Sequence, residues 1–155
     1  MKRLYKVVAA FLAGALVTVL VVRLGGHAAS DPGMAFQNAR EMILSDLDGN
    51  RLCFLDLVSS GGETCCLFFR LNQCYSCIFR GMEDLKLLQQ QEKNCFAVAV
   101  HDSIEDVRGW LTHESFHPVY VMSRAAFLRH VTCRSLPVIV RLEKSRVIHC
   151  EYPVP

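Results

Sequence analysis

The residues best suited to chemistry are two cysteines three positions apart, Cys74 and Cys77, which enclose Tyr75 and Ser76. Thiols at this spacing can form a disulfide and part again on reduction. If Cys74 stands at the start of a helix, unpaired amide N–H groups and the positive helix end favour its thiolate. Such placement lowers a thiol pKa from about 8.5 into a range of about 3.5–7.5. We therefore assign Cys74 as a nucleophile toward disulfides and Cys77 as the thiol that resolves the mixed disulfide.

The same cysteine pair has a second interpretation as part of a metal site. Cys74 and Cys77, joined by a histidine from another loop, would bind copper or zinc. The histidines considered for this role are His113, His117 and His130. In the preferred interpretation the dithiol needs neither a metal nor a cofactor, and a purely structural pair is a further alternative.

The rest of the composition narrows the function classes. The formal net charge is only +2, so no electrostatic case exists for binding nucleic acid. Long apolar runs indicate a full hydrophobic core, so most of the eight cysteines are expected to be small buried residues. This expectation covers Cys53, Cys65, Cys66 and Cys95. Two cysteines are less clear, because Cys133 is a candidate second redox thiol and Cys150 a candidate for a structural disulfide.

The N-terminal segment bears on where the domain works. Three basic residues precede an uncharged run from Val7 to Val22, which Arg23 closes. A basic start followed by an apolar run of this length is typical of a signal anchor whose N-terminus stays in the cytoplasm. A signal peptide cleaved near residues 26–29 is an alternative, and a buried core helix is another.

These features divide the chain into three parts. We expect a signal anchor or transmembrane helix over 1–24, a tether over 25–39 and a folded domain over 40–155 that faces outward. Residues 34–45 are expected to form a short helix leading into a strand, and the turn at Asp48-Gly49-Asn50 predicts a β-hairpin.

Beyond the hairpin, apolar runs of strand length alternate with helical patterns. The expected strands are 64–71, 96–100, 119–122, 138–142 and 146–151. Helices are expected after Cys77, after a capping Ser103 and over 124–131. This alternation indicates an α/β fold in which helices cover a mixed sheet.

Three stretches carry a resemblance to a known family. "LSDLDGNRLCFLDLVSSGGETCCLFF" resembles an opening hairpin and first central strand, "CYSC" an active-site motif, and "RSLPVIV" a cis-proline loop. Over about residues 40–152 the chain resembles the TlpA/ResA-type branch of the thioredoxin superfamily. The resemblance implies a thioredoxin-like fold with a central mixed sheet. It also implies that Pro137 is the cis-proline, that Leu136 pairs with an extended substrate segment, and that Tyr75 and Ser76 contact substrate.

The resemblance also implies an activity and a place. Such a protein is a thiol–disulfide oxidoreductase, here expected to reduce protein disulfides, with electrons from a membrane partner. It would be a single-pass protein of the bacterial inner membrane with its domain outside. Three positions depart from the family pattern: Gln73, Phe68 and Val138. Without a polar residue at Phe68, Cys77 would depend on water or on a carboxylate such as Glu83. These departures keep a redox-inactive interaction domain as an alternative.

Overall fold

The structure is a computed structural model that describes residues 34–58, 62–111 and 116–154. All of these belong to one compact unit, Pro32–Pro155. The expected transmembrane helix over 1–24 lies outside the described residues. Within the described ranges, no helix has the length and apolar character needed to cross a membrane.

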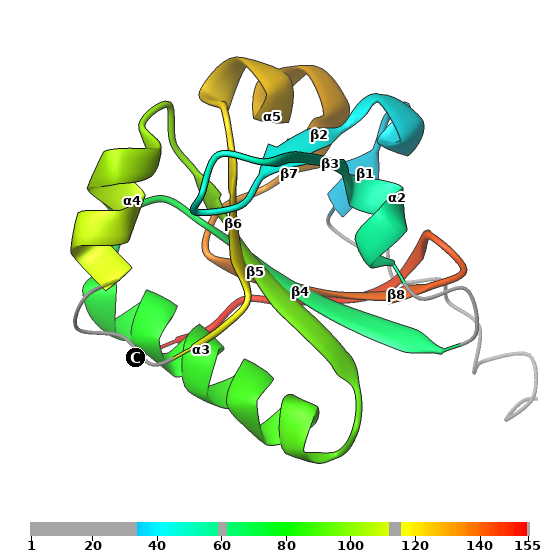
Figure 1. The fold of residues 1–155 in the computed structure, drawn as a ribbon. Coiled ribbons are helices and arrows are strands. Elements are labelled where there is room, and N and C mark those ends of the chain that lie inside the picture. The colour runs from blue at the N-terminus through cyan, green and yellow to red at the C-terminus, as the bar shows by residue number, and fades with distance from the viewer. Residues whose placement is uncertain (1–33, 59–61, 112–115, 155) are drawn as a thin grey trace, which may run out of the picture. The chain divides into compact units, whose positions relative to one another are not determined.

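Seven strands form one mixed sheet in the order β3-β2-β6-β5-β4-β8-β9 (Figure 1). The three central strands β4, β5 and β6 run parallel, and the strands outside them pair antiparallel. The strands are β2 (Ile43–Ser45), β3 (Arg51–Cys53), β4 (Glu63–Phe69), β5 (Asn94–Val100), β6 (Val119–Met122), β8 (Val138–Glu143) and β9 (Arg146–Glu151). This mixed sheet confirms the expected α/β class.

Helices cover both faces of this sheet. In Figure 1, α3 and α4 lie on one face, while α2, α5 and the small sheet of β1 and β7 lie on the other. The helices are α2 (Phe54–Leu57), α3 (Tyr75–Gln90), α4 (Ile104–Leu111) and α5 (Arg124–His130), with a 3₁₀ turn η1 at Ala39–Glu41. The hydroxyls of Ser103 and Ser123 accept backbone N–H groups at 3.1 and 3.2 Å, as expected for the caps of α4 and α5.

The core has two halves because strand side chains alternate between the faces of the sheet. On β4, Leu67 and Phe69 pack toward α3 and α4, against Ile78, Met82 and other apolar side chains of those helices. Phe68 packs on the opposite face, in the cluster that includes residues of α2 and α5. The strand is therefore buried on both sides. The cysteine motif follows shortly after its last residue.

The N-terminal hairpin confirms the turn predicted at residues 48–50. β2 and β3 pair antiparallel, with Ser45 opposite Arg51. Asp46 closes the turn by accepting the side chain and the backbone N–H of Asn50, both at 2.8 Å. Gly49 has a φ of +87°, which glycine adopts without the steric cost of a side chain.

The short helix leading into a strand that was expected over residues 34–45 is confirmed only at its end, where the turn η1 leads into β2, and is wrong at its start. Met34–Phe36 form β1, which pairs antiparallel with β7 (Val131–Cys133), within the stretch 25–39 expected to precede the domain. The physical reason is tertiary: the ring of Phe36 lies 5.1 Å from Phe54 and 5.9 Å from Phe68. Burial against these rings and pairing with β7 outweigh a local helical pattern. The strand β7 was likewise not among the expected strands, and it begins at Val131, the last residue of the helix expected over 124–131.

Candidate active site

The cysteine motif begins five residues after β4 ends at Phe69. Cys74 is the N-cap residue of α3, and its carbonyl accepts the Ile78 N–H at 3.1 Å, which closes the first helical turn. Two hydrogen bonds between Arg70 and Gln73 hold the segment that leads into this turn. The Arg70 N–H donates to Gln73 Oε1 at 3.2 Å, and the Gln73 N–H donates to the Arg70 carbonyl at 3.2 Å. Gln73 therefore has a structural use at a position where the sequence showed only a departure.

The two sulfur atoms of the motif are in direct contact. The thiol of Cys77 donates to the sulfur of Cys74 over 2.6 Å, and the Ser76 hydroxyl lies 3.2 Å from the same sulfur. Cys74 is exposed, whereas Cys77, one turn into α3, is half-buried. The more accessible thiol is therefore the one that receives hydrogen bonds.

These contacts separate the acidities of the two thiols. The hydrogen bond from Cys77 is the largest effect, and with Ser76 and the nearby backbone amides it lowers the pKa of Cys74 to about 7. The same contact raises the pKa of Cys77, because Cys77 must keep its proton to donate it. Near neutral pH, Cys74 is thus about half thiolate while Cys77 remains a thiol. Because a thiolate attacks disulfides and a protonated thiol does not, Cys74 is the more reactive of the two thiols at this pH.

The proline loop lies beside this motif. The Leu136–Pro137 peptide bond is cis, as the family resemblance implied, and Pro137 is buried. Leu136 and Gln73, the residue before Cys74, line the same groove of about 360 Å³. The groove also includes the end of β4, part of α5 and β7. A surface hollow therefore lies between the proline loop and Gln73, the residue that precedes Cys74, while Cys74 itself is not among the lining residues.

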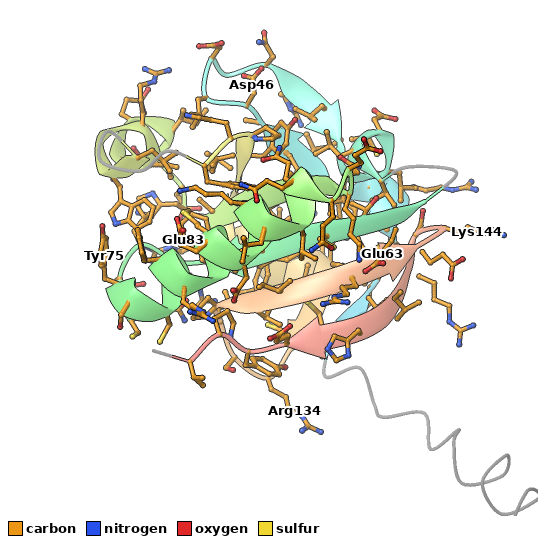
Figure 2. The ribbon with its side chains drawn as sticks, turned by 90° about the horizontal axis from the view of Figure 1, so that it is seen from below. Asp46, Glu63, Tyr75, Glu83, Arg134 and Lys144 are labelled. Atoms are coloured by element: carbon orange, nitrogen blue, oxygen red, sulfur yellow. The ribbon has the colours of Figure 1, made fainter. Side chains whose placement is uncertain are left out.

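Tyr75, between the two cysteines, does not line the groove and packs against other aromatic side chains. Its ring stacks on Phe79 at 6.5 Å and meets Trp110 edge-on at 5.9 Å. Trp110, on α4, is half-buried and packs against Phe69 at 5.5 Å. Figure 2 shows Tyr75 at one end of the molecule and Glu63, at the start of β4, toward the other. Exposed aromatic surface thus flanks Cys74.

The remaining cysteines sort by burial. No disulfide joins any of the eight cysteines, all of which the structure describes, so the disulfide considered for Cys150 is not formed. Cys65, Cys66 and Cys95 are buried as expected, and burial raises the pKa of Cys66 well above its ordinary value. The expectation of a buried thiol is wrong for Cys53, which is half-buried and donates to the Arg40 carbonyl at 3.4 Å.

Two features of the cysteines were not visible in the sequence. Cys65 and Cys95 are register partners on the adjacent parallel strands β4 and β5, so they share one face of the sheet. Cys133 lines the groove beside Leu136, and burial raises its pKa. A protonated Cys133 is a weaker nucleophile than Cys74 at neutral pH. The pairing of β4 with β5 and the path of β7 decide these positions, and both depend on distant parts of the chain.

The histidines that the structure describes do not converge on the cysteine pair, and His113 lies outside the described residues. Among the described residues, no three His, Cys, Asp or Glu side chains are grouped to hold a metal ion. His130 is buried and bonds to the Gln37 carbonyl at 3.1 Å. Residues 113–117 read HESFH, the spacing of helix-borne zinc ligands. His117 nevertheless follows the end of α4 at Leu111 and precedes β6 in an irregular segment, and residues 112–115 lie outside the described ranges.

Phe68 and Glu83 are the two positions that bear on proton transfer to Cys77. Phe68 is fully buried in the core. Glu83, labelled on α3 in Figure 2, pairs with Lys86 at 2.7 Å. Glu83 lies six positions beyond Cys77 on the same helix, which turns it to a different face. Within the described part of the chain, no carboxylate contributes to the pKa of Cys77.

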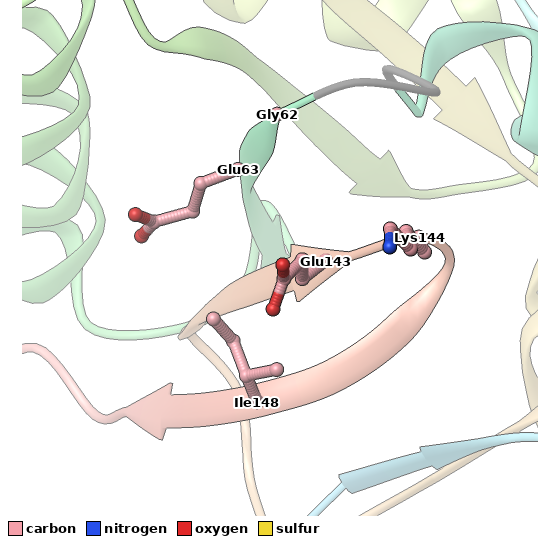
Figure 3. Close-up of a pocket in the computed structure, with 5 residues that line it drawn as sticks. All are labelled: Gly62, Glu63, Glu143, Lys144 and Ile148. Atoms are coloured by element: carbon pink, nitrogen blue, oxygen red, sulfur yellow. The ribbon is translucent and has the colours of Figure 1, made fainter.

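A second hollow lies at the far end of β4. It has a volume of about 230 Å³ and is lined by Gly62, Glu63, Glu143, Lys144 and Ile148 (Figure 3). Figure 3 shows the Glu63 side chain directed away from the β8–β9 hairpin, and its carboxylate pairs with Lys93 at 2.9 Å. No cysteine lines this hollow, so the groove beside Cys74 is the better candidate for a functional site.

The fold is similar to those of solved thiol–disulfide proteins. No family model matches the chain, and no curated protein sequence is significantly similar to it. A thiol:disulfide interchange protein from a Bacteroides species superposes with a TM-score of 0.57 at 13% identity. The superposition covers 71% of this chain and 76% of that one. The chain has a thioredoxin-like fold.

Two further neighbours agree with this thioredoxin-like fold. The thioredoxin domain of a thiol-disulfide oxidoreductase from Bacteroides vulgatus superposes with a TM-score of 0.57 at 13% identity, covering 77% of this chain and 90% of that one. An exposed lipoprotein thioredoxin from Streptococcus pneumoniae gives 0.55 at 14% identity, covering 78% and 91%. In this thioredoxin-like domain, Cys74 is the N-cap residue of α3, the helix that follows the central strand β4.

Proposed function

We propose that this chain is a thiol–disulfide oxidoreductase in which Cys74 is the nucleophile and Cys77 the resolving thiol. The observation that carries the proposal is the asymmetry of the pair. Cys74 is exposed and has a pKa of about 7, while Cys77 is half-buried and holds its proton against Cys74. An interaction domain without redox activity has no need for this arrangement.

The reaction follows from the positions of the two thiols. The Cys74 thiolate attacks one sulfur of a substrate disulfide and forms a mixed disulfide, and the other substrate sulfur leaves as a thiolate that takes a proton from solvent. Cys77 then loses its proton to water and attacks Cys74, 2.6 Å away. The substrate leaves with both sulfurs reduced, and the chain keeps the Cys74–Cys77 disulfide. Two electrons have moved from the chain to the substrate.

We favour the direction in which the chain reduces its substrate. A strongly lowered pKa stabilises the reduced form of a dithiol and makes its disulfide oxidising, as at a pKa of about 3.5, whereas thioredoxin itself has about 7. The pKa of about 7 for Cys74 lies with the reducing proteins. The reductant must be re-reduced after each turnover, which requires two electrons from a dithiol partner.

The place of action rests on the N-terminal sequence. With 1–24 as a signal anchor, the domain would stand outside the inner membrane of a bacterium, in the manner of TlpA/ResA-type proteins. Its substrates would be protein disulfides on that side, and its electron donor a membrane protein. Leu136 on the cis-proline loop, Tyr75 and Ser76 would then border the bound substrate.

The reduction of insulin disulfides by the full chain, with dithiothreitol as electron source, tests this function. Cys74→Ser should lower the rate to that of dithiothreitol alone, because no thiolate remains to start the exchange. Cys53→Ser is the matched control, since Cys53 is a half-buried thiol on the edge strand β3, and it should keep the full rate. Equal activity of Cys74→Ser and the unmodified chain would refute the function. Cys77→Ser should accumulate a mixed disulfide between Cys74 and insulin.

A further inference from the structure

The groove beside the cysteine motif has a distinct chemical character. Its volume is about 360 Å³, and it adjoins Cys74 through Gln73 and the cis-proline loop through Leu136. Phe127 and Leu128 supply apolar surface from α5, and Leu128 is 73% exposed. Two arginines, Arg70 and Arg134, also line the groove. Among the described residues that line it, none is acidic.

Arg70 is held by contacts with Gln73 and with Phe127. Its backbone is locked to Gln73 by the two hydrogen bonds of 3.2 Å that shape the approach to Cys74. Its guanidinium carbon lies 5.9 Å from the centre of the Phe127 ring, a cation–π contact. The cation therefore cannot move far from the groove without giving up both contacts.

One donor of this held guanidinium is unused. The Nε atom of Arg70 is buried and has no hydrogen-bond partner. A buried N–H group without an acceptor is costly, and a guanidinium is best satisfied by a carboxylate that bonds two of its donors at once. Because the Nε atom is enclosed, a carboxylate brought by a ligand would satisfy it only if the guanidinium turns toward the groove. Arg134, on the opposite wall formed by the proline loop, adds positive charge to the same hollow.

From these contacts we propose that Arg70 and Arg134 select the substrate. The groove prefers extended polypeptide segments that carry an Asp or Glu side chain near the half-cystine attacked by Cys74, with the exposed Leu128 receiving an apolar neighbour. This inference rests on the proposed oxidoreductase function and names its substrate class. Successive residues of an extended chain advance about 3.3 Å, so the acidic residue belongs within about three positions of the cysteine.

The preference is measured with three matched peptides and the full chain. Each peptide contains one cysteine in a mixed disulfide with 2-thiopyridine, a neutral leaving group, and differs only in having Glu, Gln or Lys two positions from that cysteine. Release of pyridine-2-thione gives kcat/KM. Glu should exceed Gln by about tenfold, the value of a hydrogen bond to a charged group, and Lys should be slowest. The advantage of Glu should shrink as salt is added, because the charges are partly exposed.

Variants assign the preference to the groove. Arg70→Gln and Arg134→Gln should each lower the ratio of kcat/KM for the Glu peptide to kcat/KM for the Gln peptide. Arg129→Gln is the control, because it removes an exposed cation from α5 that does not line the groove. It should leave the Glu advantage intact. Circular dichroism of each variant checks that it is folded, and the peptide comparison in the unmodified chain requires no substitution.

The results distinguish a failure of the proposed preference for acidic peptides from a failure of the oxidoreductase function. If the unmodified chain reduces the Glu and Gln peptides at equal rates, and Cys74→Ser abolishes both, the selectivity is overturned and the oxidoreductase function stands. If Arg129→Gln abolishes the advantage as fully as Arg70→Gln, general positive charge is responsible and the assignment to the groove is wrong. If the unmodified chain reduces neither the peptides nor insulin, the function itself fails and the selectivity fails with it.

Discussion

The thiol of Cys77 donates a hydrogen bond to the sulfur of Cys74 over 2.6 Å, and this contact is the largest cause of the lowered pKa of Cys74. The two sulfurs are thus already within reach of each other in the reduced state. Their difference in exposure and acidity supports a fixed order of reaction, with Cys74 first.

Alkylation of Cys74 should follow its ionisation. Because the thiolate is the nucleophile, the rate should be low below pH 6, rise through a midpoint near the pKa of about 7, and level off above pH 8. The measurement is the rate of iodoacetamide labelling of the reduced full chain at several pH values, with the labelled peptide identified by mass spectrometry. Cys133, whose pKa is raised by burial, should react only at higher pH. A midpoint for Cys74 near the ordinary value of about 8.5 would contradict the geometry.

Removing the hydrogen-bond donors to Cys74 should raise its pKa in a definite order. Cys77→Ala removes the largest contribution and Ser76→Ala the second, so the first should shift the alkylation midpoint upward by more than the second. From a pKa of about 7, the first unit of increase lowers the thiolate fraction at pH 7 by about fivefold, and a further unit lowers it by about tenfold. The same labelling profiles measure both shifts. If Ser76→Ala causes the larger shift, the assigned order of contributions is wrong.

Two helical glycines should respond oppositely to alanine. A Cβ at Gly81 would lie 2.9 Å from a Leu67 methyl group and 3.1 Å from Pro153, so Gly81→Ala should lower the free energy of unfolding by about 1–3 kcal/mol through overpacking. A Cβ at Gly109 meets nothing within 4 Å, so Gly109→Ala should raise it by up to about 1 kcal/mol through helix propensity. Denaturant unfolding of both variants compares them. A stabilising Gly81→Ala would show that α3 packs less closely on β4.

The buried and half-buried cysteines should also differ when replaced. Cys66 is fully buried, so Cys66→Ser places a hydroxyl in the core and should cost about 1–3 kcal/mol of stability. Cys53→Ser should stay within about 0.5 kcal/mol, because the new hydroxyl can still donate to the Arg40 carbonyl. Thermal unfolding of the two variants gives the comparison. Equal losses would mean that Cys53 is as enclosed as Cys66.

The parts of the fold that the sequence predicted are those with a local cause. The apolar run of β4 next to CYSC, the caps at Ser103 and Ser123, and the turn at Gly49 all follow from residues close in the chain. The short strand β1 was missed because only its distant partner β7 and the rings of Phe54 and Phe68 make it a strand.

The candidate site shows the same division. Cys74 and Cys77 were visible as a motif, and Pro137 was visible through a resemblance. The groove was not, because Arg70, Phe127 and Arg134 come from three separate elements that only the folded sheet brings together. The hydrogen bond from the Arg70 N–H to Gln73 Oε1 was also not predicted, since the partner of the Gln73 side chain is a backbone group.

The most direct test of the central claim is a redox titration of the full chain in dithiothreitol or glutathione buffers, with mass spectrometry to identify the paired cysteines. We predict a single two-electron transition that joins Cys74 to Cys77, at a potential close to the thioredoxin value of about −270 mV. If no disulfide forms between these two sulfurs at any potential, the proposed exchange chemistry is contradicted. A transition near about −120 mV would keep the exchange but reverse its direction, making the chain an oxidant.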